Sequence, residues 1–383
     1  MTPLQTTPLP WMTEDIAMFR DAARRFIEGE LAPHCERWRK QGFVDCEVWR
    51  KVGEMGMLLP ELDEEWGGAG GNLAHQLVMV EELGRAEVPV STSVHTIAAH
   101  YILDYGTDEQ KRRWLPKMAS GELLAGIAMT EPDAGSDLQG IRTRAVHDGD
   151  DYVINGAKTF ITNGATAHLL VVVVRTCAEK GGKGLSLIVL ETEGLAGFRV
   201  GRILDKIGQK GSDTAELFFD DVRVPAANLL GGAEGQAFAQ LMSQLPYERM
   251  LLAVLAIAVI ERALELTIDY TKARKAFGQT VFDFQNTRHK LAECATTAHV
   301  MRVFVNDCIQ RLLDGRLDAT AAYMAKCWCS EQQCKVLDEC LQFFGGYGYM
   351  SEYPIARLWA DARVQKIYGG TNEIMKELIA RAL

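Results

Sequence analysis

Apolar residues recur every three or four positions near the start of the chain, which is the spacing of one face of an α-helix. The clearest case comprises Ile16, Phe19, Ala23, Phe26 and Ile27. Thr13 stands just ahead of this stretch and is a suitable N-cap residue. Residues 75–85 and 109–119 show the same spacing. We therefore predict that the segment from residue 11 to residue 123 is helical.

The middle of the chain has a different pattern, with short apolar or β-branched runs bounded by Gly, Lys and Asp. The segment His147–Asp151 has the sequence His-Asp-Gly-Asp-Asp, which predicts the turn of a β-hairpin. Because no helical stretch separates the runs, a mostly antiparallel sheet is expected, as a small barrel or sandwich. The predicted strands are residues 142–146, 152–155, 169–174, 185–190 and 216–219.

Helical spacing returns in the last part of the chain, in long stretches at 251–274, 284–313 and 318–344 whose lengths are typical of a helix bundle. The apolar run Met250–Ile260 has eleven residues, whereas a membrane span needs about 20, so it predicts a buried helix. The predicted fold class is α+β, mainly α. It has an N-terminal helical domain, a central antiparallel β domain and a C-terminal helical bundle, over residues 1–123, 124–232 and 233–383.

Composition narrows the class of protein. The chain has 383 residues, of which 48% are hydrophobic and 24% charged, as in an ordinary soluble globular protein with two or three packed units. Its net charge of −10 is a poor match for nucleic acid, whose phosphates attract basic surfaces. We therefore expect no nucleic-acid partner.

The segment Met1–Pro10 is polar and rich in proline, without the basic and apolar regions of a signal peptide. A cytoplasmic protein of bacterial type is therefore expected, and its nine cysteines should be reduced thiols. Four cysteines cluster without a Cys-x-x-Cys pair or a nearby histidine, which favours buried helix positions over a metal site. They are Cys327, Cys329, Cys334 and Cys340.

Two motifs lie in the predicted β domain. The first, Met129–Asp137, offers backbone amides and hydroxyls that suit a flat polar ring or a phosphate. The second, Lys158–Gly164, places the ring of Phe160 and the hydroxyl of Thr162 two residues apart, on one face of a strand. This pair suits stacking on a planar cofactor. Taken singly, a structured turn and a half-buried strand are the simpler interpretations.

Three further motifs lie in the C-terminal part. Tyr270–Gly278 is basic and is followed by Gln285, so its cations either clamp a pyrophosphate or face a helix end. Gln342–Tyr349 contains a glycine pair that allows close approach to a ligand but also suits a helix C-terminus. Tyr368–Ile374 is a Gly-rich loop before a helix N-terminus, a geometry suited to anions or carbonyl oxygens.

Together, these five motifs in this order resemble the acyl-CoA dehydrogenase family. The resemblance extends from residue 12 to residue 383, and Ile367–Arg381 is most similar to the long-chain branch. It implies a helical domain, a β domain and a C-terminal four-helix bundle, assembled as a dimer of dimers. It also implies FAD as cofactor, an acyl-CoA as substrate and an electron-transfer flavoprotein as electron acceptor.

The resemblance also assigns residues to the flavin site. Phe160 would stack on the flavin ring and Thr162 would bond near its reactive nitrogen, while a neighbouring subunit would hold the pyrophosphate and adenine. The full set implied for the cofactor is Ile127, Met129, Thr130, Ser136, Phe160, Ile161, Thr162, Arg274, Phe277, Gln285, Gln342, Gly345, Gly346, Thr371 and Glu373.

One position departs from the commonest family pattern. Many relatives place the catalytic glutamate directly before the Gly-Thr of the fifth motif, where this chain has Gly369. Long-chain and isovaleryl-type relatives carry the base in an earlier helix, and residues 245–251 resemble that pattern, which implies Glu248 as the base. The apolar run beside it is expected to raise the pKa of its carboxyl, as suits a general base. The alternative is a surface glutamate paired with Arg249.

The implied reaction is α,β-dehydrogenation of an acyl-CoA thioester to a trans-2-enoyl-CoA. Glu248 would take the α proton while the β hydrogen passes as hydride to flavin N5, and the backbone N–H of Gly369 would bind the thioester carbonyl. Long-chain or branched acyl groups are favoured, with Met79, His95 and Tyr247 as candidates for the acyl pocket. The residues implied for substrate binding are Ser136, Tyr247, Arg249 and Gly370.

Two other functions remain open. A flavin oxidase that uses O2 shares this fold, although acyl-CoA oxidases are usually longer than this chain. A catalytically inactive relative that only binds acyl-CoA would explain the glycine at position 369.

Overall fold

The computed structural model describes residues 10–90, 92–177 and 181–383. The expectation of no signal peptide falls on the segment Met1–Pro10, which lies outside these ranges except for its last residue. The N-terminal part is helical, as predicted. Its helices are α1 (Glu14–Phe26), α2 (Cys35–Gln41), α3 (Cys46–Glu54), α4 (Leu73–Arg85), α5 (Thr92–Tyr105) and α6 (Asp108–Ala119).

Thr13 stands at the N-cap position of α1, but its hydroxyl bonds to the side chain of Asp15 and makes no bond to the helix backbone. Side-chain capping by Thr13 is therefore not observed. The helix instead has two acidic residues in its first turn and two basic residues in its last turn, which complements its dipole.

The central domain is a continuous sheet in the order β1-β4-β2-β3-β7-β6, with β5 paired to β4. Most neighbours are antiparallel, as predicted, but β1 pairs parallel with β4, and β2 meets β4 in parallel at one residue pair. Within this sheet, the described strands β1, β4 and β5 join β2, β3, β7 and β6 at only one residue pair, and one face of β4 packs against β3 and β7. They are β1 (Ala125–Ala128), β2 (Arg144–Asp148), β3 (Asp151–Thr162), β4 (Leu169–Arg175), β5 (Leu185–Glu191), β6 (Phe198–Ile203) and β7 (Thr214–Pro225).

The predicted hairpin between β2 and β3 is confirmed. Asp148 pairs with Asp151 across a two-residue turn, and Gly149 in that turn has a φ of +66°, which glycine adopts without strain. The strand β4 is buried along nearly its whole length because its two faces contribute to different hydrophobic clusters. Leu169, Val171 and Val173 pack with α5 and α6, whereas Leu170, Val172 and Val174 pack with β3 and β7.

The C-terminal part is a bundle built on α7 (Ala237–Ala273), which contacts α8 (Gln285–Leu313), α9 (Ala319–Phe343) and the N-terminal helix α4. The helix predicted at 251–274 begins earlier, because Pro246 lies inside α7 without ending it. Two shorter helices, α10 (Pro354–Ala362) and α11 (Asn372–Ala380), pack against α9. A small hairpin of β8 (Lys275–Ala276) and β9 (Gln279–Thr280) joins α7 to α8.

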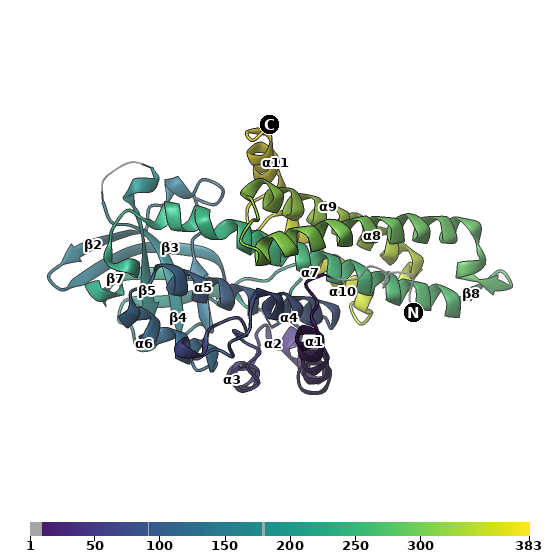
Figure 1. Cartoon of the computed structure of the whole chain (residues 1–383), viewed down its shortest axis with the longest axis horizontal. Coiled ribbons are helices and arrows are strands. Elements are labelled where there is room, and N and C mark those ends of the chain that lie inside the picture. The colour runs from purple at the N-terminus through teal and green to yellow at the C-terminus, as the bar shows by residue number, and fades with distance from the viewer. Residues whose placement is uncertain (1–9, 91, 178–180) are drawn as a thin grey trace.

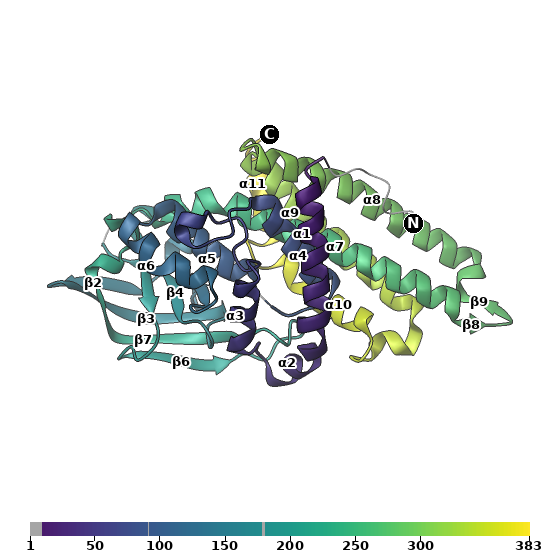
Figure 2. The ribbon, with the colours of Figure 1, turned by 60° about the horizontal axis from the view of Figure 1, so that its bottom comes forward.

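The sheet and the far end of the bundle lie at opposite ends of the molecule, with α1 and α4 between them (Figure 1). Figure 2 shows the same separation after rotation, with β2 at one end and the β8–β9 hairpin at the other. Within the described ranges, no helix has the length and apolar character needed to cross a bilayer. In the same ranges, no group of three or more His, Cys, Asp or Glu side chains is arranged to hold a metal. All nine cysteines are free thiols.

Candidate active site

Glu248 is a buried carboxyl on α7, with 8% of its surface exposed. Burial raises its pKa to about 7, because the charged form loses its hydration, while a hydrogen bond from Tyr101 and the charge of Arg249 oppose that rise. The Tyr101 hydroxyl on α5 donates to Glu248 Oε1 over 2.9 Å. Glu248 is therefore not the surface residue of the alternative interpretation, and its pKa suits a general base near neutral pH.

Arg249 faces the fifth motif and not Glu248. Its Nε donates to the carbonyl of Gly369 over 3.1 Å, and its guanidinium lies 4.7 Å from the ring centre of Tyr323. Lys326 on α9 binds the next residue of this motif, Gly370, since its Nζ donates to the Gly370 carbonyl over 2.5 Å. Two buried cations thus bind consecutive carbonyls of the glycine turn.

The glycine turn packs directly on α7. Gly369 and Gly370 have φ values of +64° and +91°, which side chains other than glycine rarely adopt. A Cβ at position 369 would lie 2.6 Å from Leu252 Cδ1, and Leu252 is one helical turn beyond Glu248. The structure therefore brings the fifth motif next to Glu248. It also shows that position 369 has a left-handed backbone, which glycine adopts more readily than glutamate.

The first two motifs lie side by side. The N–H of Thr159 donates to the carbonyl of Thr130 over 2.9 Å. Lys158 is fully buried and donates to the Met129 carbonyl and to Glu131, both over 2.9 Å. Burial lowers the pKa of Lys158 to about 8, and the charge of Glu131 opposes that fall. This ion pair ties the loop after β1 to β3.

Phe160 does not continue a regular strand. Its φ is +59°, and the pairing of β3 with β7 shifts register between Lys158 and Ile161. The surface of Phe160 is 67% exposed. The backbone at this bulge is therefore not that of a regular strand, although Phe160 and Thr162 are both more exposed than Ile161 between them. Ile161 is buried, and Thr162 is partly buried and pairs with Thr214.

A residue absent from the predicted set closes this end of β3. Asn163 also has a positive φ, of +59°, and its Nδ2 donates to the carbonyl of Ala125 over 3.1 Å. It thereby fixes the end of β3 against β1. The Asn-Gly pair signals a turn in sequence but does not reveal this partner, which is 38 positions away.

The third and fourth motifs meet at the end of the bundle far from the sheet (Figure 1). Tyr270 stacks on Phe344 with ring centres 4.2 Å apart, and Arg274 lies 6.0 Å from the ring centre of Tyr347. The predicted cofactor residues at this end are all exposed, Phe277 to 95%. These residues are Arg274, Phe277, Gln285, Gln342, Gly345 and Gly346. A single chain does not bring them to Phe160.

Three family models together cover nearly the whole chain. The N-terminal, middle and C-terminal domains of acyl-CoA dehydrogenase match residues 13–122, 126–222 and 235–383. The chain belongs to the acyl-CoA dehydrogenase family. Enzymes of this family use FAD, and a solved glutaryl-CoA dehydrogenase of similar fold is in complex with FADH2.

Relatives within the acyl-CoA dehydrogenase family align over almost the full chain. The mitochondrial long-chain specific acyl-CoA dehydrogenase of Mus musculus is 49% identical, over 96% of this chain and 86% of its own length. The acyl-CoA dehydrogenase of Geobacillus kaustophilus has a TM-score of 0.96 and 45% identity, covering 98% and 99% of the two chains. A structure described as the electron transferring flavoprotein of Acidaminococcus fermentans has a TM-score of 0.92 and 38% identity, covering 97% and 98%.

The residues around Phe160 fit the isoalloxazine of FAD. A largely exposed phenyl ring offers an apolar surface for stacking, and no side-chain hydrogen bond within the described residues engages the hydroxyls of Thr130 and Thr162. Ile127 and Met129 are partly buried beside them, and Ser136 is exposed on the same loop. An exposed aromatic with free hydroxyls nearby matches the needs of a planar heterocycle.

The remaining predicted site residues differ from one another in burial and in hydrogen bonding. Thr371 is the N-cap of α11, and its hydroxyl accepts from the N–H of Ile374 over 3.3 Å. Glu373 is exposed in the first turn of that helix, where hydrogen bonds from its own N–H and from Thr371 lower its pKa. Tyr247 is buried and stacks on His100, and its hydroxyl has no partner within the described residues.

Two candidates for the acyl pocket have structural partners instead. His95 is fully buried, and its Nδ1 accepts from the N–H of Ala125 over 3.1 Å. Its Nε2 must then carry the proton that it donates to the Met118 carbonyl, also over 3.1 Å. Met79 is fully buried in the hydrophobic cluster of α1 to α4. Both residues connect elements of the fold.

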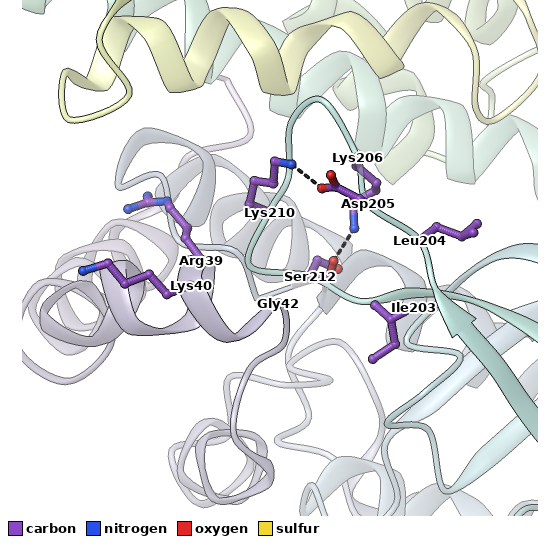
Figure 3. A pocket seen from close by; sticks show the side chains of 9 residues that line it. All are labelled: Arg39, Lys40, Gly42, Ile203, Leu204, Asp205, Lys206, Lys210 and Ser212. Atoms are coloured by element: carbon purple, nitrogen blue, oxygen red, sulfur yellow. Dashed lines mark hydrogen bonds and ion pairs between the residues drawn. The ribbon is translucent and has the colours of Figure 1, made fainter.

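A surface pocket of about 230 Å³ lies elsewhere, between the end of α2 and the segment that joins β6 to β7 (Figure 3). Four cations line it, but each already has an acceptor. Lys206 bonds to the Ser212 carbonyl and Lys210 to Asp205, while Lys40 pairs with Glu36 and Arg39 bonds to the Glu87 carbonyl. None of the predicted site residues lines this pocket.

Proposed function

We propose that this acyl-CoA dehydrogenase catalyses α,β-dehydrogenation of an acyl-CoA thioester to a trans-2-enoyl-CoA, with Glu248 as the base. The observation that carries the proposal is the burial of Glu248 directly beside the glycine turn of the fifth motif. A base on α7 is further supported by Gly369, which offers no side chain at the position used by many relatives.

The glycine turn has the complementary role. The N–H of Gly369 binds the thioester carbonyl, where negative charge develops as the α proton leaves. Arg249 and Lys326 bind the carbonyls of Gly369 and Gly370, which fixes the peptide planes of the turn before substrate arrives. Glu248 then accepts the α proton at a carboxylate that burial has made more basic.

FAD, when bound, supplies the acceptor for the β hydrogen and its electron pair. Phe160, Thr162 and Thr130 would hold its ring system, and Arg274 and Gln285 of a neighbouring copy would hold its pyrophosphate and adenine side. An electron-transfer flavoprotein takes the electrons in the next step. The structural relative from Acidaminococcus fermentans motivates this assignment of the acceptor.

The acyl group is proposed to be long or branched. The support is the 49% identity to a long-chain specific relative and the position of the base on α7. Flavin bleaching across a series of acyl-CoAs of increasing length tests this assignment. Equal or faster bleaching by butyryl-CoA would contradict it.

The test of the base is Glu248→Gln. We expect the variant to retain FAD and to bind acyl-CoA, but to lose flavin bleaching by about a thousandfold or more, because general-base catalysis is removed. Glu265→Gln is the matched control, since Glu265 lies on the same helix and pairs with Arg85 far from the glycine turn. Rapid bleaching in Glu248→Gln would refute the assignment.

A further inference from the structure

Consecutive residues of α5 contact consecutive residues of α7 at the proposed base. The Tyr101 hydroxyl bonds to Glu248 Oε1, and the neighbouring His100 ring stacks on Tyr247 with centres 4.5 Å apart and planes 17° apart. His100 Nε2 is in turn 2.9 Å from a carboxylate oxygen of Glu61. All five side chains are buried or nearly so. The turn of α5 that carries Tyr101 is thus fixed by two separate contacts.

We propose that Tyr101 is the positioning residue for the base: its hydroxyl holds Oε1 of Glu248 and so presents Oε2 to the α carbon of the substrate. The inference rests on the proposed function, because it concerns how Glu248 works. In the reaction, the C–H bond at the α carbon breaks and an O–H bond forms at Oε2. Oε1 then becomes the carbonyl oxygen of the acid and continues to accept from Tyr101.

Two features argue that this hydrogen bond matters for the chemistry. A glutamate side chain has several rotatable bonds, and one strong contact in a dry site restricts the plane of its carboxylate. The same bond stabilises the charged form of Glu248 and therefore opposes the effect of burial on its pKa. The other ionisable groups near Glu248 are Arg249, which faces the glycine turn, and Tyr247, whose hydroxyl is not bonded to it.

Tyr101→Phe tests the inference, because it removes only the hydroxyl. We expect the maximal rate of flavin reduction by acyl-CoA to fall about ten- to a hundredfold with little change in the substrate concentration at half-maximal rate. The pH midpoint of that rate should rise by about one unit, because the carboxylate loses a stabilising donor. A merely structural role would not move the pH midpoint.

Tyr105→Phe is the matched control. Tyr105 lies one turn later on α5, and its hydroxyl donates to the backbone carbonyl of Gln240 on α7 over 3.3 Å. Its loss should leave the pH midpoint unchanged. An unchanged midpoint in Tyr101→Phe, or the same rate loss in both variants without a shift, overturns the inference.

If the Tyr101→Phe protein does not fold, a second substitution tests the same inference. Tyr101 replaced by 3-fluorotyrosine keeps the ring and gives a stronger donor, so the pH midpoint should fall below that of the native protein. No change would overturn the inference. Failure of the proposed function is separable, because it appears as rapid bleaching in Glu248→Gln whatever Tyr101 does.

Discussion

For the residue Glu248, burial raises the pKa of the carboxyl, which suits the proposed general base but lowers the free energy of unfolding at neutral pH. Its pKa in the folded protein is about 7, against an ordinary value of 4.5. The unfolded chain therefore releases this proton at lower pH than the folded protein does. As pH rises from about 4.5 to about 7, this group lowers the free energy of unfolding, and the loss is complete above that range.

Glu248→Gln should therefore stabilise the protein at pH 8 and have little effect at pH 4.5. The expected gain at pH 8 is about 3 kcal/mol, from the size of the shift in pKa. Denaturant unfolding of both proteins at the two pH values, with FAD present in excess, measures the difference. A gain of equal size at both values would show that the effect comes from packing and not from the buried charge.

The residues of the site differ in how far the sequence reveals them. Glu248 could be singled out as the candidate base, because the family resemblance and the glycine at 369 both point to it, and its predicted apolar surroundings are confirmed. Tyr101 and Lys326 could not, because their partners lie 147 and 44 positions away along the chain. The left-handed backbone of Phe160 was also hidden, since alternation in a strand predicts the opposite geometry.

At the scale of the element, the helices of two domains are joined by buried ion pairs. Glu81 on α4 bonds to Arg20 on α1, and also to Arg302 on α8 over 2.5 Å. Arg302 binds Glu261 on α7 as well, over 2.8 Å. Helix periodicity predicted most of these helices, because each has an apolar face. It could not predict which helices meet, because these charged partners are far apart in sequence.

Glu81→Gln should destabilise the protein by about 3 kcal/mol, because it leaves the buried Arg302 and the partly buried Arg20 without their shared carboxylate. Glu36→Gln is the control, since Glu36 forms an exposed pair with Lys40 within α2 and should show no measurable change. Thermal unfolding of the FAD-bound proteins compares them. Equal midpoints for the native protein and Glu81→Gln would contradict the expected role of this ion pair.

At the scale of the whole molecule, the predicted cofactor residues occupy two distant places. The residues around Phe160 lie on the sheet, whereas Arg274 and its neighbours lie at the far end of the bundle (Figure 1). The sequence patterns assigned both groups of residues to helices, strands or loops, but they could not predict the distance between the two groups. If both groups bind FAD, as proposed, a complete site would need a second copy of the chain.

Mixing two inactive variants tests this requirement. In a dimer of one Glu248→Gln chain and one Arg274→Glu chain, one site receives both defects and the other receives neither. Random exchange of subunits should therefore restore about a quarter of the native activity, since half of the dimers are mixed and each has one intact site. Sites formed within single chains would give no recovery.

The packing of Gly369 against Leu252 limits how the catalytic carboxyl can relocate during evolution. A glutamate introduced at position 369 would need a left-handed backbone and would press its first carbon into the leucine. A carboxyl at position 369 would therefore require both this backbone conformation and a new position for the Leu252 side chain. If Glu248 is the base as proposed, moving the carboxyl to position 369 would thus involve three residues: Glu248, Leu252 and Gly369.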